Sequence, residues 1–311
     1  MSRKTFLAMA LPLALPLALT SCGGDSNSDT ATGSLAVRLV DAPVDDASSV
    51  VVTVAGVSLN YEGAGWVDYN FDSPRSVDLL TLQGGESLPL FPQAEVAAGS
   101  YRIRLNLHSD GDMATNEHYL VASADSGEHA LTIPSGFETG LKLNSSVVVP
   151  ANGSASYTID FDVRRSVVMR GNNENNNGYA LKPVLRLIDN TQADVISAVI
   201  NDTDPSLFSS NCSDNDPLTH NVVYIFEGDV TPDDYGSGGA QAVTTAPVTF
   251  DEQSGEYRYT SAPLLYGEYT LALTCNADLE DVEADDELNF KLVSRVTVGV
   301  SETAQVVAEE Q

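Results

Sequence analysis

The sequence predicts an all-β protein made of two tandem β-sandwich domains, which follow a lipoprotein signal peptide and a flexible tether. Three observations support this fold class. Apolar residues recur at every second position through most of the chain, short clusters of turn-forming residues separate these segments, and no long stretch has the spacing of an amphipathic helix. Only Ser76 to Leu82 is expected to form a short helical turn.

Residues 1–21 are typical of a bacterial lipoprotein signal peptide. Arg3 and Lys4 precede an uncharged, mostly apolar run that is too short to span a membrane as a helix. The run ends in Leu-Thr-Ser-Cys at residues 19–22, which resembles a lipobox, the site where a cysteine is lipidated and becomes the new N-terminus. We therefore expect Cys22 to anchor the chain. The alternative is an ordinary secretory signal in which this cysteine has no special role.

The residues after the lipobox favour the outer membrane as the destination. Gly23 stands where an aspartate retains many lipoproteins at the inner membrane. Residues 22–32 are mostly small and polar, which predicts a flexible tether. We expect the exported part to face the periplasm or the cell surface.

The charge of the chain excludes some partners. It contains 15 Lys and Arg against 44 Asp and Glu, a formal net charge of −29. Such a surface repels nucleic acids and anionic lipid headgroups. We therefore expect no nucleic-acid partner, and contact with a membrane only through the N-terminal lipid.

Alternating residues mark the strands in chain order. Leu35, Val37 and Leu39 open the first domain, and residues 50–59 form a long β-branched run. Further strands are expected at residues 101–107, 157–162, 269–275 and 290–298. The apolar pattern breaks near residue 190, so we place the first domain at 33–190 and the second at 191–311.

Two cysteines remain beyond the lipobox. Cys212 and Cys275 form an even pair in an oxidising compartment, which predicts one disulfide, and Cys275 shares the apolar face of its strand. Closing a loop of this size constrains the unfolded chain by about 4 kcal/mol in the entropic model. Neither cysteine lies in a C-x-x-C motif, so a structural role is favoured over a redox role.

The first half of the chain resembles a known family. The resemblance rests on collinear blocks at residues 33–39, 41–47, 76–80, 83–85, 98–101, 128–136, 140–143, 159–166 and 181–187. Over residues 33–188 the chain is similar to the domain-of-unknown-function family numbered 4382. That resemblance implies a bacterial lipoprotein and no established activity. The second half resembles an extension that some members carry, with strand entries similar to those of transthyretin-like or carboxypeptidase-regulatory-like sandwiches.

Acidic residues are the candidate metal ligands. Asp41, Asp45 and Asp46 lie in a proline-containing turn and would either bind calcium or satisfy the turn backbone. Two acidic loops of the second half supply further candidate calcium ligands, namely Asp229, Asp233, Asp234, Asp278, Asp281, Asp285 and Asp286. The alternative is a solvated acidic surface, since neither loop has the spacing of an EF-hand. Calcium is the only cofactor that the sequence suggests.

No motif predicts catalysis. The histidines are His108, His118, His129 and His220, and none lies in an H-E-x-x-H motif. We expect His108 and His118 to be polar loop residues and His129 to anchor a turn. The sequence also has no G-x-S-x-G motif and no Walker loop.

Trp66 is the single tryptophan, and two interpretations stay open for it. It would either expose an aromatic face to a sugar or fill the hydrophobic core, as tryptophans in strands usually do.

The sequence therefore predicts a membrane-anchored, non-catalytic envelope lipoprotein that acts as a surface adhesion, scaffold or binding module. Its partner would be an envelope protein or a glycan. The alternatives are a calcium- or carbohydrate-binding module, and a hydrolase, which would need a pocket that joins a histidine to carboxylates.

Overall fold

The computed structural model describes residues 31–42, 47–108, 117–123, 127–133, 139–170, 178–200, 212, 221–299 and 307–308. All of them belong to one compact unit, residues 31–311, and their regular secondary structure is nearly all β-strand, which confirms the all-β sandwich prediction. Cys22, Asp45, Asp46 and His220 lie outside the described residues. Within the described part, no helix is long and apolar enough to cross a membrane.

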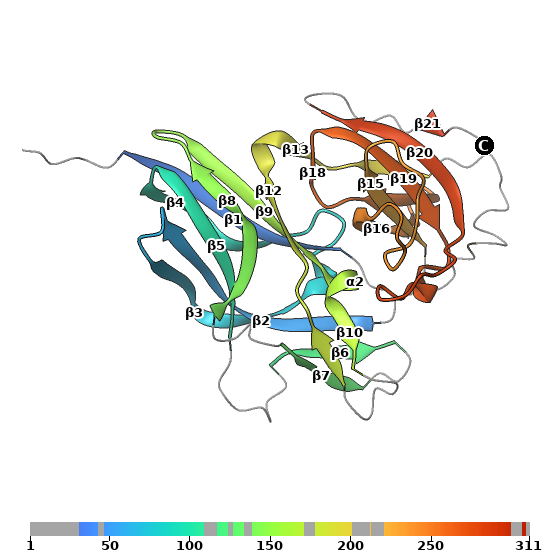
Figure 1. Cartoon of the computed structure of the whole chain (residues 1–311), viewed down its shortest axis with the longest axis horizontal. Coiled ribbons are helices and arrows are strands. Elements are labelled where there is room, and N and C mark those ends of the chain that lie inside the picture. The colour runs from blue at the N-terminus through green and yellow to red at the C-terminus, as the bar shows by residue number, and fades with distance from the viewer. Residues whose placement is uncertain are drawn as a thin grey trace, which may run out of the picture. The chain divides into compact units, whose positions relative to one another are not determined.

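The first sheet has four strands in the order β12-β9-β1-β4 (Figure 1). Their bounds are β1 Thr32–Ala42, β4 Leu88–Ala97, β9 Ser154–Asp162 and β12 Leu185–Asp189. β1 runs parallel to β9 and antiparallel to β4. The first strand of the compact unit therefore lies in the middle of a sheet.

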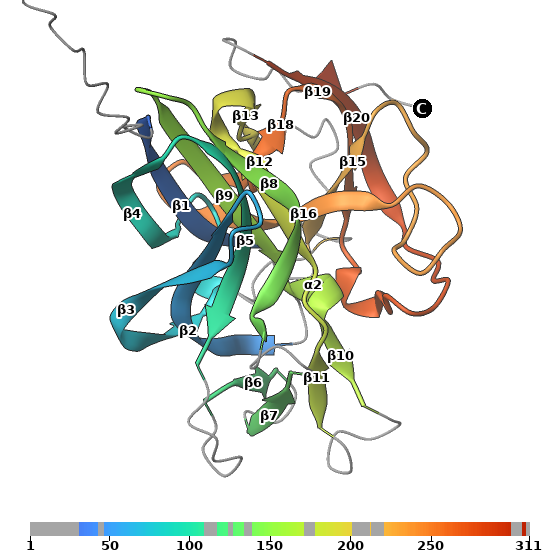
Figure 2. The ribbon, with the colours of Figure 1, turned by 60° about the vertical axis from the view of Figure 1, so that its left-hand side comes forward.

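The second sheet has eight strands in the order β10-β11-β7-β6-β2-β5-β8, with β3 paired to β2. Their bounds are β2 Ala47–Tyr61, β3 Trp66–Asp78, β5 Gly99–Leu107, β6 Tyr119–Ala122, β7 Glu128–Thr132, β8 Leu141–Val149, β10 Val167–Met169 and β11 Tyr179–Leu181. Figure 2 shows β3, β2, β5 and β8 side by side.

One hydrophobic core joins these two sheets. Leu35 and Ile159 of the first sheet pack in the same cluster as Val57, Ile103 and Leu105 of the second, and all five are at most 1% exposed. The alternation of the sequence explains this sandwich, because each strand turns its apolar residues toward the facing sheet.

The C-terminal part is built on a seven-stranded sheet in the order β14-β17-β16-β15-β19-β20-β21. The bounds are β14 Ser197–Val199, β15 Val222–Glu227, β16 Ala242–Asp251, β17 Glu256–Thr260, β19 Gly267–Thr274, β20 Phe290–Val298 and β21 Val307–Ala308, and a separate pair joins β13 Ala193–Asp194 to β18 Leu264–Leu265. Both faces of β15 are buried, with Val223 and Ile225 in one cluster and Tyr224 and Phe226 in another.

The described hydrophobic clusters do not mix residues from the two parts of the chain. The first contains core residues between 35 and 181, and the other two contain core residues between 196 and 298. Residues 31–311 nevertheless form one compact unit, so the domain boundary near residue 190 stays a prediction.

Short helical turns connect several strands. They are η1 Leu79–Thr81, α2 Val163–Ser166, η2 Asn190–Gln192 and η4 Ala277–Leu279. The first falls within the short turn expected at Ser76 to Leu82, although Ser76 itself belongs to β3. Asp162 caps α2 by accepting a hydrogen bond from the backbone N–H of Arg165.

On the outer face of the first sheet, polar residues that the alternating pattern predicts to be exposed are buried. Thr158, Asp160 and Asp162 alternate with apolar residues in β9, yet each is at most 1% exposed. Arg186 of β12 pairs with Asp160 at 2.6 Å, and β1 and β12 approach β16 and β18 of the C-terminal part. These polar residues are therefore buried beneath segments that are distant in the sequence.

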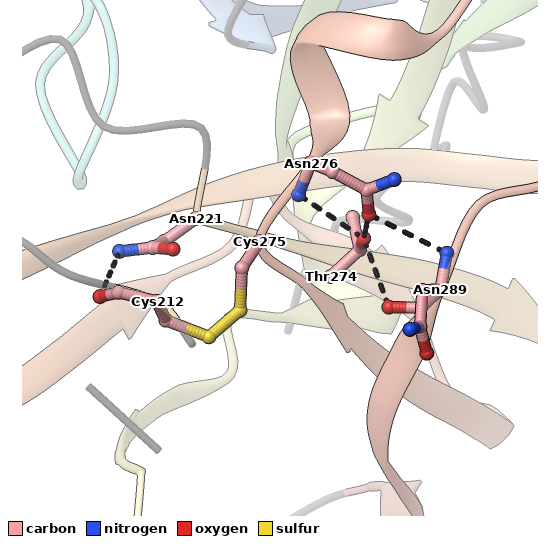
Figure 3. Close-up of a disulfide and its surroundings, with 6 residues drawn as sticks. All are labelled: Cys212, Asn221, Thr274, Cys275, Asn276 and Asn289. Atoms are coloured by element: carbon pink, nitrogen blue, oxygen red, sulfur yellow. Dashed lines mark hydrogen bonds between the residues drawn. A yellow bond between two sulfur atoms is a disulfide. The ribbon is translucent and has the colours of Figure 1, made fainter. Parts of the chain in front are cut away.

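The predicted disulfide is present. Cys212 is bonded to Cys275, which follows β19 (Figure 3). Cys212 is 3% exposed, and Cys275 packs partly buried against the same core cluster. Beside it, Thr274, Asn276 and Asn289 share hydrogen bonds that hold the end of β19 to the start of β20.

Candidate functional site

The outward face of β3, β2, β5 and β8 carries rows of polar side chains. Residues that lie opposite one another in antiparallel strands share a face of the sheet. One row runs Asp68, Ser58, Arg104 and Lys142, and the adjacent row runs Trp66, Asn60, Arg102 and Ser146. We call this surface the polar face.

Hydrogen bonds fix the centre of the polar face. The hydroxyl of Ser58 donates to Oδ1 of Asp68 at 2.6 Å and lies 2.9 Å from Oδ1 of Asn106. The amide of Asn106 donates to Oδ1 of Asn70 at 3.2 Å. Since Ser58 is only 5% exposed, this network is anchored in the sheet and does not depend on solvent.

A cavity of about 240 Å³ opens beside this network. Its lining includes Trp66, Asp68, Asn70, Arg104, Asn106 and Thr139. The lining combines hydroxyl, amide, carboxylate and guanidinium groups with one aromatic ring, so it offers both donors and acceptors to a ligand.

Gly140 is required where β8 approaches β5. Its φ of +67° is in the left-handed region, and a Cβ there would lie 2.9 Å from Oδ1 of Asn106. A side chain at this position would push into the cavity wall. Glycine therefore lets the backbone form that wall.

Trp66 and Arg104 are in direct contact in the lining of the cavity. The guanidinium carbon of Arg104 lies 3.6 Å from the centroid of the indole ring, and that of Arg102 lies 5.9 Å away. Nε of Arg104 is buried and has no hydrogen-bond partner among the described residues. The ring therefore holds a guanidinium group whose hydrogen-bonding capacity is not used up.

The core interpretation of Trp66 is wrong. The residue begins β3, is half-buried, and does not belong to the hydrophobic cluster between the two sheets. Alternation within β3 turns Trp66, Asp68 and Asn70 outward, and the edge position of this strand leaves the ring partly accessible.

A second candidate site is acidic and lies in the C-terminal part. Asp234, Glu280 and Asp286 each offer a carboxylate oxygen within 4.8 Å of the other two. Asp234 is 1% exposed, and its Oδ1 has no hydrogen-bond partner among the described residues. Its Oδ2 accepts hydrogen bonds from the backbone of Gly236 at 3.0 Å and of Asp286 at 3.1 Å. We call these three residues the acidic cluster.

Glu280 is held in this cluster by two donors. The hydroxyl of Tyr224 lies 3.1 Å from one carboxylate oxygen, and the backbone N–H of Tyr235 lies 3.1 Å from the other. Burial raises the pKa of Glu280, while these hydrogen bonds and nearby Arg164 oppose the rise. The arrangement brings oxygen ligands of the kind that calcium prefers to one place.

The other predicted metal ligands are not members of the acidic cluster. Asp229 pairs with Arg295 at 2.6 Å, which neutralises it. Asp281 accepts a hydrogen bond from the backbone of Glu283 at 3.0 Å. Asp233, Asp278 and Asp285 are not members of the cluster either. Among the predicted residues, the structure therefore unites only Asp234 and Asp286, together with Glu280.

Asp41 does not lie in a turn. It belongs to β1, is 4% exposed, and its Oδ2 accepts a hydrogen bond from the amide of Gln83 at 3.2 Å. Burial, and to a lesser degree Asp160 and Asp162, raises the pKa of Asp41 well above its usual value. The expectation that Asp41 lies in a turn is therefore wrong, because β1 extends to Ala42.

The described histidines have structural partners. Nδ1 of His118 accepts from the backbone of Thr53 at 3.2 Å, and its Nε2 lies 2.9 Å from the carbonyl oxygen of His108. Burial lowers the pKa of His118. His129 lies within β7, and its ring centroid is 5.6 Å from that of Tyr179.

A larger groove of about 690 Å³ lies in the C-terminal part, beside the ion pair of Asp229 and Arg295. Neither this groove nor the cavity of the polar face is lined by a histidine. Neither of these two cavities therefore has the combination of histidine and carboxylates that a hydrolase of the expected kind requires.

Comparison with protein families identifies a relationship for the first half of the chain. Residues 32–183 match the model of a family described as "Domain of unknown function (DUF4382)". No curated protein matches the chain. Among solved structures, "The Bacillus anthracis TIE protein" is 13% identical over 84% of this chain and 31% of that chain, with a TM-score of 0.19. The chain spans less than a third of that protein, and so weak a likeness carries no argument.

Proposed function

Since the chain belongs, through residues 32–183, to the family described as "Domain of unknown function (DUF4382)", whose description names no activity, we propose its function from geometry. We propose that it is a non-catalytic, lipid-anchored envelope protein that binds a carbohydrate in the cavity of the polar face. Cys22 would supply the anchor, and the outer membrane is the proposed destination.

The observation that carries this proposal is the cavity itself. It places the indole of Trp66 and the guanidinium of Arg104 beside Asp68, Asn70 and Asn106. A sugar presents many hydroxyl groups, each able to donate and accept, around a compact apolar ring. A lining that mixes amides, a carboxylate and one aromatic ring satisfies both properties.

The size of the cavity limits the ligand. Its volume of about 240 Å³ is below the roughly 300–1,000 Å³ that is typical of pockets for drug-sized molecules. It therefore suits one sugar unit, with any neighbouring units lying along the open face of the sheet. Recognition of a single unit within a longer glycan fits a module that holds an envelope polymer.

Trp66 gives this proposal a direct test, because it is the single tryptophan of the chain. The full chain, purified in detergent, would be titrated with defined oligosaccharides while tryptophan emission is recorded. We expect a saturable change in emission with at least one of them. Asn70→Ala should weaken binding at least tenfold, while Gln253→Ala, at an exposed position between β16 and β17 of the C-terminal part, should leave it unchanged. No saturable change with any oligosaccharide would refute the proposal.

We also propose calcium as a ligand of the C-terminal part. The observation that favours it is the unpartnered Oδ1 of Asp234, a carboxylate oxygen that is buried and belongs to the acidic cluster. A buried carboxylate oxygen without a donor costs free energy unless a donor or a cation satisfies it. Calcium would then stabilise the fold and would not take part in sugar binding.

A further inference from the structure

We infer that the sugar bound at the polar face carries an anionic group, a carboxylate or a sulfate, and that Arg104 binds this group. The inference rests on the carbohydrate-binding function proposed above and names the chemical class of its ligand.

The first argument is the distribution of charge. Acidic residues outnumber basic residues by 44 to 15, so a basic side chain in this protein has many possible partners. Several described cations have such a partner, in Lys182–Glu283, Arg186–Asp160, Arg258–Glu256 and Arg295–Asp229. Others, such as Arg38 and Arg75, make no ion pair with a described residue but hydrogen-bond to a hydroxyl group or pack on a ring. The polar face brings three cations without an ion pair together.

Arg102, Arg104 and Lys142 make no ion pair among the described residues, although all three belong to the polar face. Arg104 lies directly opposite Lys142, and Arg102 is two residues away on the same strand. The carboxylate in these two rows is Asp68, and Ser58 donates a hydrogen bond to it. Three cations against one carboxylate leave this face positive in a strongly negative protein.

A surface of this kind attracts anions by two effects. Like charges on adjacent strands repel one another, so the sheet is destabilised until an anion neutralises them. The field also concentrates anionic ligands near the cavity, and dissolved salt weakens this effect.

The second argument is the contact between Arg104 and Trp66. The guanidinium carbon of Arg104 lies 3.6 Å from the centroid of the indole ring, and this contact restricts the side chain. Its Nε is buried and without a partner among the described residues. A planar guanidinium binds a carboxylate or a sulfate through two parallel hydrogen bonds, and a restricted side chain loses less entropy on binding.

The neutral groups of the cavity explain why the anion would belong to a sugar. Asn70 and Asn106 are joined by a hydrogen bond at 3.2 Å, and each amide keeps hydrogen-bonding capacity for a hydroxyl group. A free inorganic anion would use Arg104 and leave this side of the cavity unsatisfied. An acidic sugar would bind Arg104 through its anionic group and the two asparagine amides through its hydroxyl groups.

The test compares ligands that differ only in charge. Isothermal titration calorimetry would measure the full chain with oligogalacturonate and with the same oligosaccharide as its neutral methyl ester, and likewise with sulfated and unsulfated dextran oligosaccharides. We expect at least one acidic ligand to bind at least tenfold more tightly than its neutral counterpart in low salt, with the difference shrinking as salt is added.

Two variants test whether the charge of Arg104 is responsible for the preference for an acidic ligand. Arg104→Gln should abolish the preference for the acidic ligand, so that the acidic and the neutral ligand bind this variant with affinities within about threefold of each other. Lys291→Gln, an exposed position on β20, removes the same charge far along the sequence and should change neither. Far-ultraviolet circular dichroism and melting curves would confirm that each variant is folded.

The outcomes are distinct. Equal affinity for acidic and neutral ligands would overturn the inference and leave the carbohydrate-binding function standing. Binding of neither would remove the proposed function as well. Tight binding of galacturonate monomer, with no gain from the oligosaccharide, would limit the ligand to one acidic sugar unit and would support the inference. Binding of free sulfate as tight as that of any acidic sugar would overturn it, because the sugar would then contribute nothing.

Discussion

Arg164 of α2 donates a hydrogen bond from Nη1 to the carbonyl oxygen of Ala277 at 3.1 Å, across 113 residues of sequence. The side chain is 5% exposed, and its guanidinium carbon lies 5.6 Å from the ring centroid of Tyr224. A residue of the segment that matches the family model therefore reaches a buried carbonyl of the C-terminal part. The contact implies that the two parts stabilise each other.

Replacing Arg164 with methionine tests this contact. The change keeps much of the volume but removes a charged donor from a buried carbonyl, and we expect a loss of about 2–3 kcal/mol in the free energy of unfolding. Urea unfolding followed by circular dichroism and by Trp66 emission would measure it. Both signals should shift together. An unchanged Trp66 transition would show that the C-terminal part does not stabilise the first half.

The environment of Asp162 should make the free energy of unfolding depend on pH. Burial, and then the neighbouring charge of Asp160, raises the pKa of Asp162 to about 6 in the folded protein, above its value of about 3.9 in an unfolded chain. A raised pKa favours the protonated form on folding. The stabilisation is therefore complete below pH 4 and is lost as the pH rises through 6.

Asp162→Asn isolates this effect. Asparagine still caps the helical turn but does not ionise, so this contribution to the pH dependence should vanish. We expect wild type to lose up to about 3 kcal/mol relative to the variant between pH 4 and pH 7. Urea unfolding at both pH values measures the difference. Parallel curves for the two proteins would contradict the prediction.

Calcium should stabilise the protein through the acidic cluster. An ion that binds only the folded state raises its melting temperature as concentration increases. We expect a rise of several degrees in millimolar calcium over EDTA at matched ionic strength. Asp234→Asn should abolish the rise, while Asp285→Asn, which is exposed and outside the cluster, should retain it. The same rise in Asp234→Asn would exclude this site.

Removing the disulfide should destabilise the C-terminal part. The bond closes a loop across a separation of 63 residues, and the entropic model assigns about 4 kcal/mol to a loop of that length. The double variant Cys212→Ser with Cys275→Ser should unfold at lower urea than the oxidised protein. Reduced wild type is the matched control, and it should behave like the double variant.

Much of the fold follows from the sequence because alternation is a local property. Leu35, Val57 and Ile103 are each flanked by residues that point the other way, so their burial could be predicted from their own strands. Asp160 shows the limit of this reasoning. Its alternation predicts a surface position, but distant segments cover that face, and no local pattern reports such coverage.

The sites depend on pairing between strands, and the sequence does not state which strands pair. Trp66 and Arg104 meet because β3 and β5 both pair with β2. Their separation in the sequence gives no signal of this contact. Glu280 cannot be singled out as a metal ligand from the sequence for a related reason. It is one of many acids in its loop, and only the donors Tyr224 and Tyr235 distinguish it.

The position of β1 has a mechanical consequence. This strand directly follows the predicted tether, so a pull from a lipid anchor enters the compact unit at its first residue and acts along its length. β1 is hydrogen-bonded on one side to β9 and on the other to β4. These bonds are roughly perpendicular to the direction of the pull. They are therefore loaded together, in shear, and would not break one after another. A strand held in this way resists extraction far better than a hairpin at the edge of a sheet, as the proposed lipid anchor would require.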